Sequence, residues 1–288
     1  MAEPPKNLAA SVKARLLNMA REQSRNFDIL LVRFALERLL FRLAQSEHRD
    51  RYVLKGGMLV THWLEHDNRE TKDMDFLGFG PDDAEAIKQT FAGIMAMEAE
   101  DGLIFDVDGL AARPIREEME YGGIRLRTYA YLERTRISIT LDIGFGDALA
   151  DAGQVMDYPS LLGMERPNIR SYPPETVIAE KFQAVVALGL ANGRMKDFYD
   201  LWALPRTLAL DEAALDAAIA ATFARRQTAV PTHCPPGLSD DMSRDPAAAQ
   251  RWRAYIASLD HPELSFADVL GDIWISLAPN CARLLGAK

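Results

Sequence analysis

Two aspartates spaced two residues apart, Asp73 and Asp75, stand in a segment whose residue types suggest chemistry on phosphate groups. The segment 73–77 has the apolar residues of a short strand, and side chains two apart on a strand share a face. Neighbouring carboxylates repel each other unless a cation lies between them, and Mg²⁺ is a common solution. Upstream, Gly56 and Gly57 open a predicted helix whose first N–H groups could bind phosphate. The segment predicts a metal and nucleotide site, although an Asp-x-Asp pair taken alone is more often a pair of exposed acids.

A third acid lies on a strand predicted farther along the chain. Residues 137–143 alternate, with isoleucine or leucine on one face and Ser138, Thr140 and Asp142 on the other. An earlier alternating run, 124–132, is separated from it by four polar residues, so the two runs predict a hairpin. Three carboxylates from two strands suit two-metal nucleotidyl transfer, in which one metal activates the attacking oxygen and the other neutralises the triphosphate.

Charged residues in the second half of the chain occupy positions where burial is costly. On a helix predicted over 175–188, Lys181 falls inside the apolar stripe. A buried ammonium needs an anion such as a triphosphate, and the alternative is a lysine that reaches solvent along the edge of the stripe. On the next helix Asp197 falls between leucines, so we expect it to be half-buried, where it could pair with Lys181, orient a substrate or favour the helix dipole. Helical spacing places Lys196 and Asp200 together on the polar side.

The composition is that of an ordinary soluble protein. No apolar run is long enough to span a membrane, and the N-terminus lacks a signal-peptide profile, so we expect a cytoplasmic location. The two cysteines and five histidines show no disulfide framework and no zinc spacing. The net charge of −9 argues against non-specific binding to duplexes. Residues 1–55 hold eleven Lys and Arg against six Asp and Glu, a net of +5, which indicates a solvated helix face or a local anionic partner such as RNA.

The order of the predicted elements indicates an α+β protein with a mixed sheet. Helices are predicted over 7–46, 57–66 and 81–97, and short strands over 52–54, 73–77, 105–110, 124–132 and 137–143. From Pro173 onward the pattern becomes helical.

Two domains follow from this order. We expect a catalytic core with N-terminal helices over 1–165 and a helical domain over 166–288, which contributes Lys181 and Asp197 to the active-site cleft. The stretch 231–246 is rich in Gly, Pro and Asp and predicts a loop.

Six motifs occur in a fixed order over residues 30–205. They are Glu37-Arg38-Leu39-Leu40, Val53-Leu54-Lys55-Gly56-Gly57, Arg69-x-Thr71-x-Asp73-x-Asp75, Leu141-Asp142-Ile143-Gly144-x-Gly146-Asp147, Ala179-Glu180-Lys181 and Arg194-x-Lys196-Asp197-x-x-Asp200-Leu201. Together they resemble the AbiEii family of nucleotidyltransferase-like toxins. No motif beyond residue 210 contributes to the resemblance.

The resemblance implies a polymerase-β-like nucleotidyltransferase core joined to a helical domain. It implies the toxin of a type IV-like toxin–antitoxin or phage-defence pair, with an antitoxin protein as partner. Relatives transfer nucleotides to the 3′ end of tRNA and so block translation. An NTP substrate, Mg²⁺ or Mn²⁺ and an RNA acceptor, tRNA in particular, are therefore implied.

The site residues are carried over motif by motif. The implied metal ligands are Asp73, Asp75 and Asp142. The implied catalytic residues are Asp73, Asp75, Lys181 and Asp197. The implied nucleotide-binding residues are Gly56, Gly57, Arg69, Thr71, Lys72 and Lys196. In one departure, many nucleotidyltransferases have Gly-Ser where this chain has Gly-Gly, which removes one hydroxyl ligand for phosphate.

Two other readings stay open from the sequence. The same fold could serve a small-molecule or protein hydroxyl as acceptor, and the basic N-terminal region favours RNA over these. A non-catalytic module that binds a nucleotide or a partner is the third reading. The presence of every expected acid argues against that third reading.

Overall fold

The structure is a computed structural model that describes residues 7–64, 69–115, 122–146, 153–259 and 263–286. The chain forms two compact units. The first contains the described residues of 1–59, 70–146 and 154–171, and the second those of 60–69, 147–153 and 172–288.

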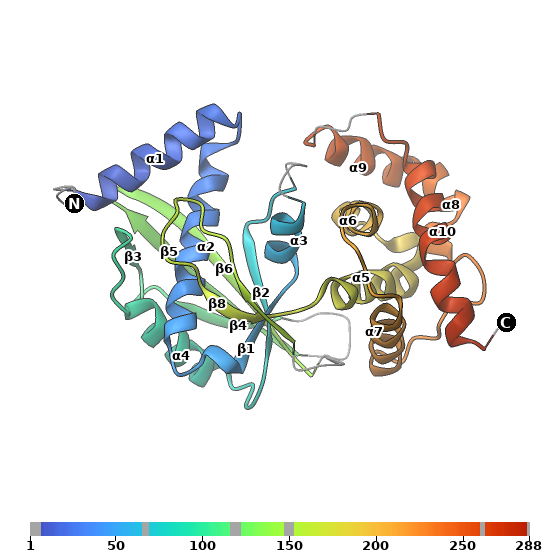
Figure 1. Cartoon of the computed structure of the whole chain (residues 1–288), viewed down its shortest axis with the longest axis horizontal. Coiled ribbons are helices and arrows are strands. Elements are labelled where there is room, and N and C mark those ends of the chain that lie inside the picture. Colours follow the sequence, from blue (N-terminus) through green and yellow to red (C-terminus); the bar gives the residue numbers. More distant parts are fainter. Residues whose placement is uncertain (1–6, 65–68, 116–121, 147–152, 260–262, 287–288) are drawn as a thin grey trace. The chain divides into compact units, whose positions relative to one another are not determined.

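Helices near the N-terminus flank the sheet of the first unit (Figure 1). They are α1 (Leu8–Glu22), α2 (Phe27–Gln45), the 3₁₀ turn η1 (Arg49–Arg51) and α4 (Ala84–Ala96), while α3 (Gly57–Trp63) begins directly after the first strand. The helical prediction for 7–46 is confirmed, with a break between α1 and α2. That break is set by Asn26, whose side chain accepts hydrogen bonds from the N–H groups of Asp28 and Ile29.

One mixed sheet carries all the described strands. They are β1 (Tyr52–Lys55), β2 (Asp73–Gly78), β3 (Leu103–Phe105), β4 (Ala111–Ile115), β5 (Gly123–Leu132), β6 (Thr135–Phe145), β7 (Gln154–Asp157) and β8 (Asn168–Ser171). The order is β3-β5-β6-β2-β1-β8-β7, and β4 also pairs with β5. The pairs β2–β6 and β1–β8 are parallel and the others antiparallel, so the predicted mixed sheet is confirmed.

The strand predicted over 105–110 is wrong for most of its length. β3 ends at Phe105, and the side chain of Asp106 then accepts a hydrogen bond from the N–H of Gly109, which closes a turn before β4. The short strands β4, β7 and β8 were not predicted. Pro114 lies inside β4, and β7 is mostly exposed, so neither shows the alternation of a half-buried strand.

The two faces of the sheet differ in chemistry. On β5 and β6, residues such as Leu126, Ile139 and Leu141 are fully buried on the face covered by helices. An aromatic cluster extends this core, since the ring centroids of Tyr52 and Phe91 lie 4.9 Å apart. The opposite face carries the polar residues of the same strands, including the aspartates of interest.

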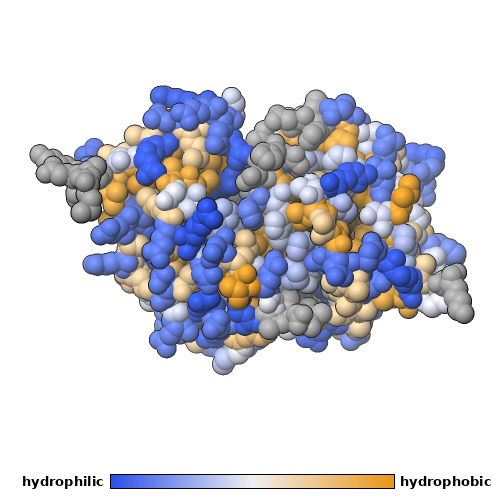
Figure 2. Space-filling view, in the orientation of Figure 1, coloured by the Kyte–Doolittle hydropathy of each residue, from blue (hydrophilic) through white to orange (hydrophobic). Residues whose placement is uncertain are grey.

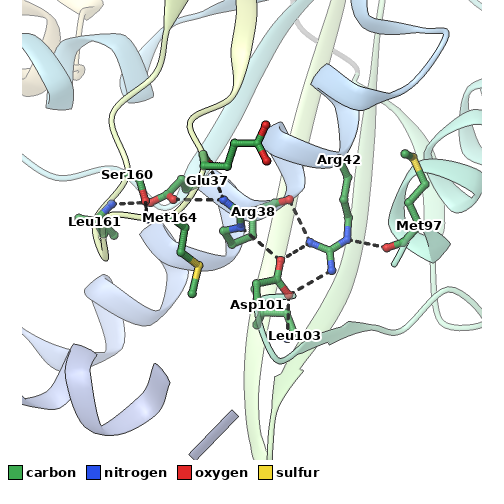
Figure 3. Close-up of polar contacts among 10 residues, drawn as sticks. Glu37, Arg38, Arg42, Met97, Asp101, Leu103, Ser160, Leu161 and Met164 are labelled. Atoms are coloured by element: carbon green, nitrogen blue, oxygen red, sulfur yellow. Dashed lines mark hydrogen bonds and ion pairs between the residues drawn. The ribbon is translucent and has the colours of Figure 1, made fainter. Parts of the chain in front are cut away.

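Part of the basic excess near the N-terminus is buried inside the first unit (Figure 3). Arg38 and Arg42 of α2 are each 3% exposed and both bind Asp101, with Arg42 Nη1 2.6 Å from Asp101 Oδ2. Arg42 also donates to the carbonyl of Met97, and Arg38 to that of Glu165. These two arginines are paired with an aspartate in the interior. The positive charge that residues 1–55 present to an anionic partner is therefore smaller than the count of Lys and Arg indicates.

The described part of the second unit is helical. Its elements are α5 (Pro174–Leu188), η2 (Gly189–Ala191), α6 (Met195–Thr207), α7 (Glu212–Arg225), η3 (Pro236–Leu238), α8 (Asp240–Arg244), α9 (Pro246–Ile256) and α10 (Phe266–Leu284). The loop predicted over 231–246 is wrong in its middle, because η3 and α8 lie there and bury Leu238 and Met242. Within the described ranges, no helix has the length and apolar character needed to cross a membrane.

Hydrophilic side chains are spread over the surface seen in Figure 2, with small hydrophobic areas among them. Single exposed apolar side chains such as Ile275 on α10 and Val155 on β7 are normal for a folded protein. On this face of the molecule, hydrophilic side chains cover more of the surface than hydrophobic ones.

Candidate active site

Strand β2 presents the two aspartates as the sequence predicted. Asp73 is exposed and Asp75 is half-buried, while Met74 and Phe76 between and beyond them are buried in the core. The alternation fixes both carboxylates on the polar face of the sheet. A slip of one residue would bury them, so the strong apolar character of Met74 and Phe76 determines where the acids point.

The glycine pair lies directly against this strand. Gly56 has a φ of +68°, and a Cβ built there would overlap the carboxylate of Asp75. A Cβ on Gly57 would lie 2.6 Å from Oγ1 of Thr71, and the N–H of Gly57 donates to Asp75 Oδ2 at 3.3 Å. Both glycines are therefore required by close approach, and a serine at position 57 would need Thr71 to move.

A row of charged residues crosses four strands at the level of Asp75. In the register, Asp75 is opposite Lys55 of β1 on one side and opposite Asp142 of β6 on the other. Asp142 is in turn opposite Arg125 of β5. Arg125 holds Asp142 through two hydrogen bonds, Nε to Oδ1 at 2.7 Å and Nη2 to Oδ2 at 2.5 Å.

Burial raises the pKa of Asp75 to about 6, opposed by Lys55 and the Gly57 N–H and reinforced by the charges of Asp142 and Asp73. The ionised form of Asp75 is therefore costly. A bound cation would remove part of that cost, because it would offset the repulsion between the neighbouring carboxylates.

The carboxylate chemistry suits a Mg²⁺ ion that also binds substrate. Such ions are usually held by one or two carboxylates together with phosphate oxygens, and Asp73 and Asp75 supply two on one face. Asp142 is the less available acid, since Arg125 occupies both of its oxygens. Consistently, the described residues contain no group of three or more His, Cys, Asp or Glu side chains arranged for a metal ion.

The second unit holds a separate ionic cluster. Lys181 of α5 is 14% exposed, and its ammonium pairs with Asp197 and, at 2.9 Å, with Asp200. Arg69 binds Asp200 with two hydrogen bonds of 2.7 and 2.8 Å. The predicted half-burial of Asp197 and its pairing with Lys181 are confirmed, and two carboxylates now account for the inward-facing lysine.

Asp200 lies at the centre of this cluster, contrary to the sequence-based prediction. It was placed on the polar side of its helix beside Lys196, yet it is fully buried while Lys196 is exposed. Burial raises the pKa of Asp200, but the ion pairs with Arg69 and Lys181 lower it more, so the net shift is downward. The prediction used only the helical spacing of residues within α6, which cannot show that Lys181 of α5 and Arg69 contact Asp200.

The remaining residues of the implied nucleotide site differ in exposure. Thr71 is buried, and its hydroxyl donates to the carbonyl of Asp73 at 3.3 Å. Lys72 is exposed, as is Lys196 in the other unit. Asp147, the last residue of one family motif, lies outside the described residues.

The chain matches a protein-family model over most of its length. The model described as "Nucleotidyl transferase AbiEii toxin, Type IV TA system" matches residues 38–272. The chain belongs to the AbiEii family. No curated protein matches at a significant level.

Solved structures resemble this AbiEii protein across most of its length. The nucleotidyltransferase toxin MenT4 from Mycobacterium tuberculosis is 17% identical with a TM-score of 0.58, and the match covers 96% of this chain and 89% of MenT4. A putative nucleotidyltransferase from Helicobacter pylori is 16% identical with a TM-score of 0.46, covering 90% and 97% of the two chains. JHP933 from Helicobacter pylori is 15% identical with a TM-score of 0.48, covering 88% and 91%. The likeness to MenT4 shows that the AbiEii protein has the nucleotidyltransferase toxin fold, with its mixed sheet followed by a helical part.

Proposed function

We infer that this AbiEii protein transfers a nucleotide from an NTP to the 3′ end of an RNA, with tRNA as the acceptor whose modification blocks translation. One observation carries the proposal. Asp73 and Asp75 share the polar face of β2, and Asp75 lies against the Gly56-Gly57 turn and accepts a hydrogen bond from the Gly57 N–H. Family membership supports the same reaction class.

The reaction joins the 3′-hydroxyl oxygen of the acceptor to the α-phosphorus of the NTP. The bond from that phosphorus to the bridging oxygen breaks, pyrophosphate leaves, and the hydroxyl proton passes to solvent. Asp73 and Asp75 would hold Mg²⁺ or Mn²⁺, which when bound neutralises triphosphate oxygens. The Gly56-Gly57 turn, Thr71 and Lys72 would bind and orient the triphosphate.

The proposal extends to residues of the second unit. The family resemblance assigns Lys181 and Asp197 to the reaction, with Arg69 and Lys196 in nucleotide binding. Because Nε and Nη2 of Arg69 both donate to Asp200, we assign Arg69 a supporting role, in which it keeps Asp200 in place beside Lys181. An antitoxin protein that suppresses the transfer is the proposed partner.

Label transfer tests the reaction. Purified protein is incubated with total RNA, a mixture of purified proteins or aminoglycosides, each with α-³²P-labelled NTPs and Mg²⁺. We expect labelled RNA with wild type and none with Asp73→Asn, Asp75→Asn or Lys181→Met, while the exposed-site control Asp82→Asn retains full transfer. If a protein or an aminoglycoside is labelled and RNA is not, the acceptor is a protein or small-molecule hydroxyl instead. Absence of any label with every NTP would indicate a binding module instead.

A further inference from the structure

One face of the sheet in the first unit concentrates arginine and tyrosine beside the carboxylates. Side chains that are paired across neighbouring strands point to the same face, and the register joins β4, β5 and β6 residue by residue. The residues on this face, called here the arginine–tyrosine face, are Arg113 of β4, Arg125, Arg127, Tyr129 and Tyr131 of β5, and Arg136 of β6.

This face is continuous with the candidate active site. Arg125 is opposite Asp142, which is opposite Asp75. One step along, Arg127 is opposite Thr140, which is opposite Asp73. Two strand spacings separate Arg127 from Asp73, about 10 Å at the backbone.

The charge on this face is available for a ligand. Arg125 is neutralised by Asp142, but in the described part of the chain no carboxylate pairs with Arg113, Arg127 or Arg136. In a protein of net charge −9, arginines gathered on one face without acidic partners form a local positive region. In the basic N-terminal region, Arg38 and Arg42 do not add such charge, because they are buried against Asp101.

Aromatic rings lie among these arginines. Tyr129 is 38% exposed, and the guanidinium of Arg136 lies 4.6 Å from its ring centroid. Tyr131 is opposite Arg136 in the register, and Ile104 of β3, 71% exposed, is opposite Tyr131. Exposed aromatic rings beside arginines are the groups on which unpaired bases stack while the phosphates are neutralised.

We propose that the arginine–tyrosine face binds the single-stranded end of the acceptor RNA next to Asp73 and Asp75. The inference rests on the proposed function, for which it supplies the acceptor-binding surface. A single strand suits the face better than a duplex, since base pairs hide the base faces that Tyr129 and Tyr131 would contact. An acidic protein would match the arginines but would leave the aromatic rings without a role.

RNA binding is measured by fluorescence anisotropy with a labelled 12-nucleotide single-stranded RNA, and with the same strand in a duplex. The main variant is Arg127→Gln/Arg136→Gln, which leaves all carboxylates in place. Its matched control, Arg244→Gln/Arg253→Gln, removes the same charge from exposed positions of the second unit. Tyr129→Ala and Tyr129→Phe separate stacking from the phenol hydroxyl. Thermal unfolding confirms that each variant is folded.

We expect the Arg127/Arg136 variant to bind single-stranded RNA at least ten-fold more weakly than the control variant. Its salt dependence, the slope of log K against log [salt], should fall by about 1.4, because roughly 0.7 is lost for each phosphate contact to a single strand. Tyr129→Ala should lose about five-fold or more in affinity, and Tyr129→Phe should retain it. Mn²⁺ binding should be unchanged in all of these variants.

Equal RNA affinity in the two double variants would overturn the proposal, as would equal competition by polyglutamate and unlabelled RNA. Stronger binding of the duplex than of the single strand would also overturn it. These outcomes are independent of nucleotide transfer. If the wild-type protein labels RNA and the Arg127→Gln/Arg136→Gln variant binds RNA normally, the proposed function is retained. Only the assignment of this face as the RNA-binding surface is then wrong.

Discussion

Asp75 and Asp142 lie opposite each other on the parallel strands β2 and β6, and Arg125 holds both carboxylate oxygens of Asp142. Asp142, which the family resemblance implies as a third metal ligand, is therefore bound by a guanidinium in this structure. Asp142 neutralises Arg125 and raises the pKa of Asp75 through its charge. Of the three neighbouring acids, Asp142 is the one that Arg125 holds.

Metal binding should depend unequally on these acids. Asp73→Asn and Asp75→Asn should each weaken Mn²⁺ binding about ten-fold or more, because each would remove one of the two carboxylates proposed as ligands. Asp142→Asn should weaken it less than about three-fold, since its oxygens are already bound by Arg125. Titration calorimetry or Mn²⁺ paramagnetic resonance measures the affinity, with the exposed-site variant Asp108→Asn as control. A loss for Asp142→Asn equal to that for Asp75→Asn would restore the three-ligand site.

Without metal, Asp75→Asn should stabilise the folded protein at alkaline pH. The folded pKa of about 6 exceeds the ordinary value of 3.8, so ionisation of Asp75 opposes folding. This penalty is absent below pH 4, grows as the pH rises to about 6 and is constant above it. The difference between these two pKa values sets an upper limit of roughly 3 kcal/mol, and partial exposure reduces the expected gain to about 1–2 kcal/mol.

Urea unfolding in EDTA at pH 4.5 and pH 8 tests this stability difference. The gain for Asp75→Asn should be complete at pH 8 and about one third as large at pH 4.5, where the carboxyl is ionised in the unfolded chain but mostly protonated in the folded one. Asp82→Asn, an exposed substitution in the same unit, should show no such difference. A gain of the same size at both values would mean that the charge of Asp75 carries no folding cost.

Breaking the Arg69–Asp200 pair should destabilise the protein strongly. Asp200→Ala removes two hydrogen bonds from the buried guanidinium of Arg69 and one ion pair from Lys181, and breaking a buried pair typically costs about 3–5 kcal/mol. The control in the same unit is Asp240→Ala, whose partner Arg244 is 72% exposed, so its loss should cost about 1 kcal/mol or less. Calorimetric unfolding at pH 7 compares the two. Equal losses would contradict the central role assigned to Asp200.

The contribution of Asp200 to folding stability should also depend on pH. Its pKa is lowered in the folded protein, because Arg69 and Lys181 outweigh burial, so its contribution is complete above pH 4 and is lost as the pH falls further. The stability difference between wild type and Asp200→Asn should therefore shrink below about pH 4. A difference that grows with acid would reverse the sign of this assignment.

Restoring the serine found in many nucleotidyltransferases should be harmful here. The Cβ of Gly57→Ser would lie 2.6 Å from Thr71 Oγ1, and we expect a loss of about 1–3 kcal/mol. Thr71→Ala removes the closest obstructing atom, Oγ1, so the double variant should lose less than the sum of the two single variants. A double-mutant cycle by urea unfolding measures this coupling. Strict additivity would show that the two positions do not compete for space.

The sequence predicted the elements whose residues alternate strongly and are buried on one side. β2, β5 and β6 were found because apolar side chains at every second position fix one face in the core. β7 and β8 were missed, since each has four residues of which only one or two are apolar. The placement of Asp73 and Asp75 on one face followed from the strand alone.

The partners of the charged residues could not be predicted in the same way. Asp200 was assigned to solvent because the periodicity of one helix says nothing about which neighbours cover it. The pairing of Arg125 with Asp142 required the exact register of β5 and β6. A four-residue link would have set Arg125 opposite Gly144, whereas the structure joins Leu132 to Thr135 with two residues between them.

That two-residue link, Glu133-Arg134, constrains how the gene can vary in length. Exposed hairpin tips usually tolerate inserted or deleted residues. Here one added residue within β5 would carry Arg125 and Arg127 to the opposite face, away from the carboxylates. Natural variation in length should therefore avoid the strand segment between Arg127 and this tip.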